Sequence, residues 1–425
     1  MVTANQAAYI YPMKTFVVLL FMLIGAPASA QRIDTVFLKN MLQSHPELFS
    51  GILHHSTQNE VQILYTQIDR DKHNKPHFRS YSYRLNPQRY FFPASTVKLP
   101  TAIFALEKLN ELHLGNLDMH TAMFTDSSFT GETKVTADTS STDGKPSVEN
   151  YIKKILLVSD NDAYNRLYEF IGRAEINRKL KKYGLNHTRI VARLALYDGG
   201  ESARHTNSII FKAWDRTITL QDQYDGKDYP MHLDNMRQGK GYLDKNDKLI
   251  MEPYDFREKN VYSIADQQMV LKRLLFPETF PKKQRFNLTK EQYQLIYRYM
   301  SMYPTESKKP TYNPPAYYPA FCKYLFYGQD SLAKMDPNIR IFNKIGDSYG
   351  YDVDNIYLVD FKNKVEFMLT AVVQSNEDGI YNDNKYEYTT VCQPFLRNLG
   401  QTVYQYELNR HKKHLPNLSK FKFAY

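Results

Sequence analysis

The sequence is short of cysteine, of tryptophan and of long apolar runs. It has two cysteines, Cys322 and Cys392, and one tryptophan among 425 residues. Two cysteines permit a single intramolecular bridge, which excludes a scaffold held by several disulfides. Whether the two thiols pair or stay free and buried is left open. No segment is apolar enough to cross a membrane in a mature chain, since the longest apolar run lies in the first 30 residues.

That run begins the chain as an export signal would. Lys14 precedes nine apolar residues, 16–24, and Ala28-Ser29-Ala30 follows them. A charged start, a short apolar core and a small-x-small site are typical of a signal peptide. We therefore predict a signal peptide over residues 1–30 and secretion across the inner membrane into the periplasm. An uncleaved anchor is the alternative, although nine apolar residues are too few to span a bilayer.

The composition excludes a disordered chain and gives a basic balance. Hydrophobic residues make up 42% and charged residues 24%, which is ordinary for a globular protein, and the net charge is +10. A basic protein can meet nucleic acid, anionic membrane surfaces or acidic glycans. The basic residues are scattered, and we read the dense run 178–182 as a solvated helix face. We therefore expect no nucleic-acid partner. His54-His55 has no third ligand at a recognisable spacing, so no metal and no cofactor are expected.

The order of the predicted elements suggests one sheet built from both chain ends. Alternating apolar residues predict strands at the two ends, and helical spacing predicts helices between them and at the close. The predicted strands are 61–65, 77–83, 339–342, 355–359 and 365–370, and the predicted helices are 34–49, 94–112, 148–157, 165–183, 261–275, 289–302 and 388–408. This order predicts an α/β fold of two lobes, with an antiparallel sheet and flanking helices in one, a helical lobe over about 90–330, and the active site in the cleft between them. Residues 120–147 are expected to be a loop, and 212–260 a Tyr-rich insertion.

Ser95 and Lys98 form the Ser-x-x-Lys motif whose context favours catalysis. An apolar segment leads into Ser95 and an apolar helix follows it. Positions i and i+3 share a helix face, so Lys98 is expected beside the Ser95 hydroxyl. Burial disfavours the charged lysine, and a neutral lysine can take the serine proton. Pro100 is expected to distort the first turn of the helix.

Two further motifs fall at element ends. Ser159-Asp160-Asn161 is predicted as a short turn between two helices, and an ordinary N-cap is its bland alternative. Lys344 and Gly346 follow an apolar strand. The lysine suits a substrate carboxylate, and the glycine lets the substrate backbone come close.

Ser-x-x-Lys, Ser-Asp-Asn and Lys-x-Gly in this order resemble the signature set of class A β-lactamases and penicillin-binding proteins. The resemblance implies that Ser95 is the nucleophile, Lys98 the base and Ser159 the proton shuttle. It implies that Asn161 and Lys344 contact substrate, with Gly346 beside them. The backbone N–H groups of Ser95 and Asp347 would form the oxyanion hole.

The chain departs from that family in two places. Ile345 stands where the family has Thr or Ser. The segment between Arg189 and Asn207 lacks the Glu-x-x-x-Asn pattern whose glutamate activates water for deacylation. Asp198 is our first choice for a substitute base and Glu201 the second.

These observations predict an exported, monomeric serine hydrolase, with residues 31–425 as its catalytic domain. Its partner would be a small-molecule β-lactam or a peptidoglycan-like acyl substrate. The first alternative is a D-Ala-D-Ala peptidase or penicillin-binding protein that deacylates slowly. The second is a non-hydrolytic module that binds the cell envelope.

Overall fold

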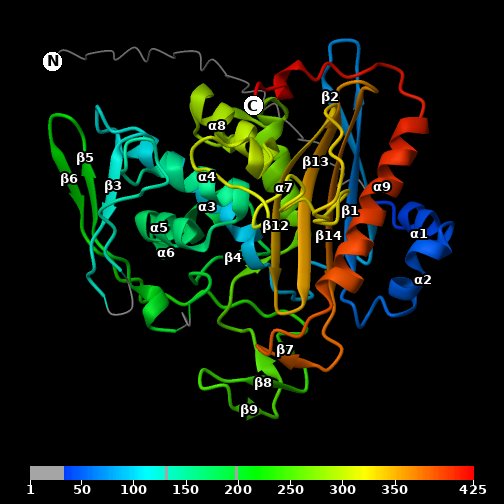
Figure 1. Ribbon diagram of the computed structural model, residues 1–425, viewed down its shortest axis with the longest axis horizontal. Helices are drawn as coiled ribbons and strands as arrows, with labels where there is room; N and C mark the ends of the chain where they lie inside the picture. Colours follow the sequence, from blue (N-terminus) through cyan, green and yellow to red (C-terminus); the bar gives the residue numbers. More distant parts are fainter. Residues whose placement is uncertain (1–32, 130–132, 197–199) are drawn as a thin grey trace, which may run out of the picture. The chain divides into compact units, whose positions relative to one another are not determined.

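A five-stranded antiparallel sheet runs through the centre of the protein and joins the two ends of the chain (Figure 1). The computed structural model describes residues 33–129, 133–196 and 200–425, so the predicted signal peptide and Asp198 lie outside the described residues. The strand order is β12-β13-β14-β1-β2. The bounds are β1 (Gln62–Arg70), β2 (Pro76–Tyr83), β12 (Ile339–Ser348), β13 (Tyr351–Asp360) and β14 (Val365–Gln374). β1 pairs with β14, with Gln62 opposite Val372, so the predicted α/β sheet built from both chain ends is confirmed.

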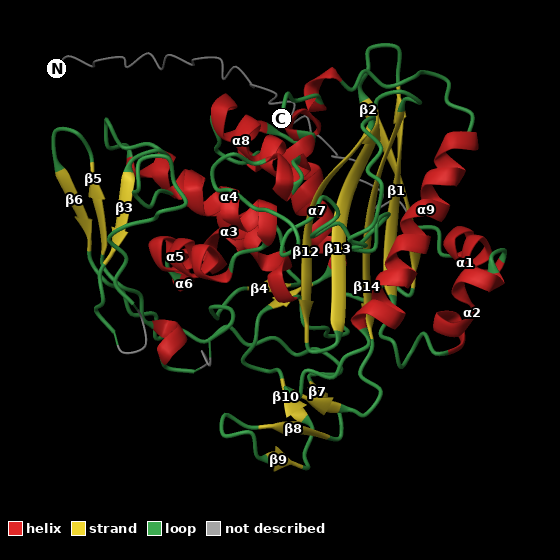
Figure 2. Cartoon of the chain, in the orientation of Figure 1, coloured by secondary structure: helices red, strands yellow, loops and turns green. Residues whose placement is uncertain are grey.

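Helices cover both faces of this sheet and enclose two hydrophobic cores (Figures 1 and 2). One face carries α1 (Val36–Gln43), α2 (Pro46–His54) and α9 (Gln393–Asn409). The helices of the other side are α3 (Lys98–Leu112), α4 (Val148–Val158), α5 (Asn161–Ile171), α6 (Arg173–Lys182), α7 (Ile264–Leu275) and α8 (Lys290–Ser301). Every residue of β13 and β14 is buried, because both faces of these strands are covered.

Prolines and glycines divide two helices that were predicted as single. The predicted helix 34–49 is two helices, because His45 precedes Pro46 and leaves the helical region, and Pro46 starts α2. The predicted helix 165–183 starts earlier, at Asn161, and breaks at Gly172, whose φ is +85°. The closing helix begins with a π-helical turn over Tyr388–Cys392.

The segments predicted as loop and insertion contain short strands. Residues 120–147 include β3 (Ala122–Thr125), which pairs with β5 (Ile209–Lys212) and so corrects the expected loop. β5 also pairs with β6 (Thr217–Leu220). The remaining short strands are β4 (Thr188–Arg189), β7 (Arg237–Gln238), β8 (Gly241–Leu243), β9 (Leu249–Ile250), β10 (Tyr254–Asp255), β11 (Val261–Tyr262) and β15 (Ile380–Tyr381). Strands this short carry too few alternations to show a period in the sequence.

The segment 302–338, which contains no strand, covers the outer edge of β12. The Tyr303 hydroxyl donates to the Ile339 carbonyl at 3.1 Å, and Lys323 Nζ donates to the Ile341 carbonyl at 3.1 Å. These contacts satisfy carbonyls that an edge strand leaves unpaired. Cys322 lies in this segment, and both it and Cys392 are free and buried. No helix of the described chain is both long enough and apolar enough to cross a bilayer.

Candidate active site

Ser95 lies in a tight turn directly before α3. The turn is the 3₁₀ helix η1 (Ala94–Val97), and Ala94 has a left-handed φ of +46°. The Thr96 hydroxyl and N–H both donate to the Pro93 carbonyl, at 2.6 and 3.1 Å. Pro100 is the third residue of α3, and the 3₁₀ helix η1 runs directly into this helix. In place of a distorted first turn of a single helix, the structure has this 3₁₀ turn before a regular α3.

Gly346 of β12 touches the backbone of this turn. A Cβ at residue 346 would lie 2.7 Å from Ser95 N, 2.8 Å from Pro93 O and 3.0 Å from Ala94 Cβ. A side chain cannot fit there unless the turn moves. The sequence suggested that this glycine lets the substrate backbone come close, whereas the backbone that approaches Gly346 in the structure is that of the turn carrying Ser95.

Lys98 is fully buried and is held by the turn between α4 and α5. Its Nζ donates to Ser159 O at 2.5 Å and Asn161 Oδ1 at 2.6 Å, and it lies 3.3 Å from Ser159 Oγ. Burial, and then the charge of Lys344, hold the pKa of Lys98 well below its usual value. Within the described chain Lys98 makes no hydrogen bond to Ser95, so the side chain expected beside that hydroxyl rests against Ser159.

Ser159 terminates α4 in a left-handed conformation, with φ of +60°. Such a conformation costs a residue other than glycine about 1 kcal/mol or more. Asp160 caps α5 through a 2.8 Å hydrogen bond from Ala163 N, so it is structural. The predicted turn between two helices is thus present, with Asn161 as the first residue of α5 and exposed.

Lys344 reaches the same serine from the sheet. It lies inside β12, which continues to Ser348, so the prediction that it ends the strand is corrected. Lys344 Nζ donates to Ser159 Oγ at 2.7 Å and to Ile345 O at 2.9 Å. Burial lowers the pKa of Lys344 to about 8. Two lysines with lowered pKa values therefore meet at one hydroxyl.

A cavity of about 480 Å³ opens beside these groups. Its lining includes Ser95, Ser159, Asn161 and Asp347, together with four residues that the sequence did not assign to the site, Phe321, Cys322, Tyr324 and Gln329. Burial raises the pKa of Cys322 to about 12, so its thiol stays protonated and is a poor nucleophile. Asp347 is the one carboxylate among the described residues of the lining.

The strand register places the backbone of Asp347 toward the cavity. Tyr349 and Gly350 form a two-residue turn with positive φ values of 55° and 78°, flanked by the pair Ser348–Tyr351. Hydrogen-bonded and non-hydrogen-bonded pairs alternate along such a hairpin. The N–H of Asp347 therefore points away from β13, toward the free edge of β12. The Ile345 carbonyl shares this orientation, because it accepts from Lys344 Nζ.

The loop after β4 forms another wall of the cavity through residues 192–196. Asn165 exchanges hydrogen bonds with the backbone of Leu194 at 2.9 and 3.0 Å, and the Asn260 amide binds Val191 and Ala192. Arg193 and Glu169 form a fully buried ion pair of 2.9 Å. Glu201, our second choice for a base, is absent from the lining. Its carboxylate faces Arg204 at 3.8 Å and His205 at 3.5 Å, and it is 66% exposed. Asp198 lies outside the described residues.

The sequence model of the β-lactamase enzyme family matches residues 50–406. The chain belongs to the β-lactamase enzyme family. Membership supports a serine hydrolase of the β-lactamase type. No curated protein matches the chain.

Solved structures resemble this β-lactamase family member at low identity. PBP-A is 16% identical over 87% of this chain and 96% of its own, with a TM-score of 0.47. A β-lactamase from Xanthomonas campestris is 12% identical over 87% and 97%, with a TM-score of 0.47. A β-lactamase from Sphaerobacter thermophilus is 12% identical over 88% and 98%, with a TM-score of 0.43. The assignment to the β-lactamase enzyme family rests on the family match alone.

The structure brings the sequence-predicted site residues to one place in this β-lactamase family member. Four of them line the cavity, two donate to Ser159, and one touches the backbone of Ser95: Ser95, Ser159, Asn161, Asp347, Lys98, Lys344 and Gly346. Asp198, which was also predicted for the site, lies outside the described residues. Among the described residues, no group of three or more His, Cys, Asp or Glu is placed to hold a metal ion.

Proposed function

We propose that Ser95 attacks the carbonyl carbon of β-lactams or related acyl compounds and forms a covalent acyl-enzyme. The observation that carries this proposal is the cluster at Ser159, where the amines of two buried lysines share one hydroxyl beside the cavity that Ser95 lines. Such a cluster can accept a proton on one side and deliver it on the other.

The hydrogen bonds of Lys98 support its role as the base. A neutral amine has two N–H donors and one lone pair. Ser159 O and Asn161 Oδ1 take the two donors at 2.5 and 2.6 Å. The lone pair is then left for an O–H donor, either the Ser159 hydroxyl at 3.3 Å or the Ser95 hydroxyl. Hydrogen bonds of this kind often tighten only when substrate binds.

Acylation then proceeds with balanced proton movement. Lys98 takes the Ser95 proton as Oγ bonds to the acyl carbon. The N–H groups of Ser95 and Asp347 stabilise the charge on the carbonyl oxygen, because both backbones border the cavity. The amide C–N bond breaks, and the proton reaches the leaving nitrogen through the Ser159 hydroxyl.

Lys344 and Asn161 are proposed to bind the substrate. A charged Lys344 attracts a substrate carboxylate, and the exposed Asn161 can pair with a substrate amide. Ile345 offers no hydroxyl to that carboxylate, so Lys344 carries more of this contact than a lysine beside a threonine would. Export to the periplasm and action as a monomer remain part of the proposal.

One observation favours a slow peptidase or penicillin-binding role for the same site. Hydrolysis of the ester needs a base placed on a water molecule. Residues 192–196 supply only hydrocarbon side chains and an arginine whose partner is Glu169. The described part of this wall therefore has no carboxylate for the deacylating water, and the acyl-enzyme should be long-lived.

Intact-mass spectrometry after addition of benzylpenicillin tests the proposal. The wild-type protein should gain the mass of one penicillin, located at Ser95 by peptide mapping, and Ser95→Ala should gain none. Ser331→Ala is the matched control, because Ser331 begins another Ser-x-x-Lys sequence outside the cavity and should label like wild type. Adducts that persist in Ser95→Ala would disprove the assignment. A folded wild type that never labels would favour the non-hydrolytic envelope-binding module.

A further inference from the structure

A second cavity, of about 520 Å³, lies between α6, β4 and the segment 227–231, and we call it the α6 cavity. Four cationic side chains line it: Arg178, Lys181, Arg189 and Lys227. None of the described residues that line it is acidic. In this respect the α6 cavity differs from the Ser95 cavity, whose lining includes the carboxylate of Asp347.

Three of these cations lack a carboxylate partner within the described chain. Lys181 and Lys227 are exposed and form no ion pair there. Arg189 is 6% exposed, and its donors bind the carbonyls of Tyr229, Arg257 and Lys259 at 2.7–2.8 Å. Its Nε has no hydrogen-bond partner, and burial lowers its pKa. Arg178 is the exception, since Glu175 neutralises it from outside the cavity at 2.6 Å.

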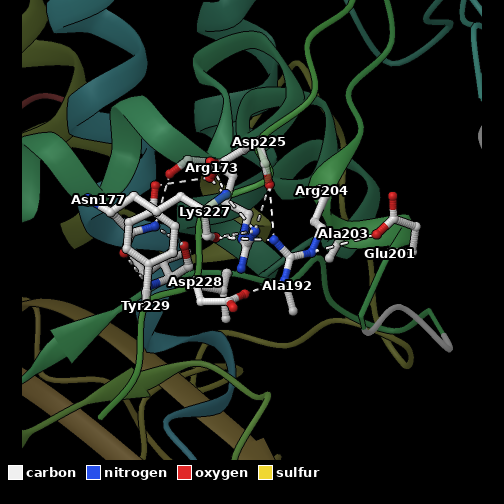
Figure 3. A network of polar contacts seen from close by, with 12 residues as sticks. Arg173, Asn177, Ala192, Glu201, Ala203, Arg204, Asp225, Lys227, Asp228 and Tyr229 are labelled. Carbon is white, nitrogen blue, oxygen red and sulfur yellow. Dashed lines mark hydrogen bonds and ion pairs between the residues drawn. The ribbon is translucent and has the colours of Figure 1, made fainter.

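The floor of the α6 cavity is apolar. Leu180 and Leu185 are buried beneath it, and Tyr229 forms one side. Figure 3 shows Tyr229 beside Arg173 and Lys227, whose charged groups lie 5.1 and 5.3 Å from its ring centre. A volume of 520 Å³ falls within the range of small-molecule sites. The cavity thus combines room for a monosaccharide-sized body with an excess of positive charge.

In the polar network next to the α6 cavity, by contrast, arginines are paired with carboxylates. Arg204 binds the Asp228 carboxylate, and Arg173 lies 3.7 Å from Asp225 (Figure 3). These acids compensate the arginines of the adjoining cavity, which is lined by Asp228 and Glu258. Arg189 lines both cavities, but none of the described residues that line the α6 cavity is acidic, so the charges of Lys181 and Lys227 are available to a ligand there.

We propose that the α6 cavity binds a small ligand with a sugar-sized body and a phosphate or carboxylate group. Arg189 is buried without an ion pair and its Nε has no hydrogen-bond partner, and an anion in the α6 cavity would offset part of the cost of that burial. Lys181 and Lys227 would meet the anion from the exposed rim, and the apolar floor would contact the body. The site is separate from the Ser95 cavity and does not depend on acyl-enzyme chemistry.

Isothermal titration of the full chain with three probes tests this proposal: glucose 6-phosphate, glucuronate and glucose. At least one of the two anions should bind saturably, and glucose should not. Preference for glucose 6-phosphate assigns a phosphate ligand, and preference for glucuronate assigns a carboxylate. The double variant Lys181→Gln/Lys227→Gln should weaken the anion about tenfold or more, because two charge-assisted contacts are lost. Both side chains are exposed, so the fold should persist.

Two matched variants make the outcome decisive. Lys39→Gln removes an exposed lysine of α1, far along the chain from α6, and should bind like wild type. Lys344→Gln removes the cation that contacts Ser159 of the Ser95 cavity and should also bind the α6 ligand like wild type. Absence of anion binding, equal binding of glucose, or unchanged affinity in the double variant would overturn the proposal. Binding lost in Lys344→Gln alone would place the anion at the Ser95 cavity and overturn it as well.

Discussion

At the scale of single residues, two buried amines meet at one hydroxyl, that of Ser159. Lys98 and Lys344 are 0% and 3% exposed, and both have lowered pKa values because burial disfavours their charged forms. The unfolded chain binds these protons more tightly than the native one. Stability therefore rises with pH through the window from about 8 to the ordinary lysine value, as Lys344 is deprotonated in the native state only.

The same shifts predict the pH profile of acylation. The rate should rise with pH as Lys98 loses its proton, and this limb should lie well below the pKa of a free lysine. For a substrate with a carboxylate, kcat/KM should fall again above about pH 8, because Lys344 loses its charge there. A neutral ester should show the rise without the fall. Stopped-flow acylation across pH 5–10 on a penicillin and a neutral ester measures both limbs.

Lys344→Gln is the control for this profile. In this variant the pH profiles of kcat/KM for the two substrates should have the same shape. The value of kcat/KM should fall more for the penicillin than for the neutral ester. Equal losses on both substrates, with the fall near pH 8 retained, would show that another group titrates there.

The site could be predicted from sequence where its parts are local or carry a motif. Ser95 and Lys98 are three residues apart, and Ser159 and Asn161 share one turn, so their grouping follows from chain geometry. Cys322 and Tyr324 enter the cavity from a segment without secondary structure, and no sequence pattern marks them. The direction of Lys98, toward Ser159 and Asn161, depends on the packing of α4, α5 and β12 and could not be read from spacing.

At the scale of elements, the contact between β12 and η1 holds Ser95, the proposed nucleophile, against the sheet. Gly346→Ala would place a methyl group 2.7 Å from Ser95 N and 2.8 Å from Pro93 O, both backbone atoms that cannot rotate away. We expect a stability loss of about 1–3 kcal/mol from overpacking and a large loss of acylation rate. Urea denaturation and penicillin labelling measure the two effects.

Gly115→Ala is the matched substitution. Its added Cβ would meet only the end of the Arg216 side chain at 3.9 Å, an ordinary contact. Both stability and labelling should stay within experimental error of wild type. If Gly346→Ala behaved in the same way, the close approach of β12 to η1 would have no functional weight.

The periodic spacing of apolar residues predicted most of the long helices and strands, whereas single residues determined where these elements begin and end. The apolar strands near residues 339–370 were predicted, although each proved longer because flanking polar residues such as Asn343 and Asp354 are also buried. Asn343 donates to Asp354 at 2.9 Å, and this pairing could not be foreseen from either strand alone. Pro46 and Gly172 ended helices inside patterns that otherwise continued.

At the scale of the whole molecule, the Ser95 cavity is assembled from segments hundreds of residues apart, and the described part of its wall over residues 192–196 carries no carboxylate that could serve as the proposed base for deacylation. Removal of a positioned base costs a factor of about 10²–10⁴ in rate. Benzylpenicillin should therefore give a burst of one equivalent followed by slow turnover. Stopped-flow absorbance with time-resolved mass spectrometry follows both phases.

The opposite result is equally informative. Rapid turnover with no detectable adduct would contradict slow deacylation and would point to an unrecognised base. If Asp198→Asn then lowered that turnover while Glu201→Gln left it unchanged, Asp198 would be the base that the sequence first suggested.

The pairing of β1 with β14 also has a consequence for how the protein folds during its synthesis. β1 ends at Arg70, and its neighbour in the sheet begins at Val365, so almost 300 residues must be synthesised between them. Until then β1 has only β2 beside it, and an isolated two-stranded hairpin is marginal in water. The nascent chain thus cannot close its sheet on the ribosome before most of it has emerged. The sheet cannot be completed until β14 has been synthesised. During this long interval the chain remains unfolded and can be bound by a chaperone or enter a translocation channel.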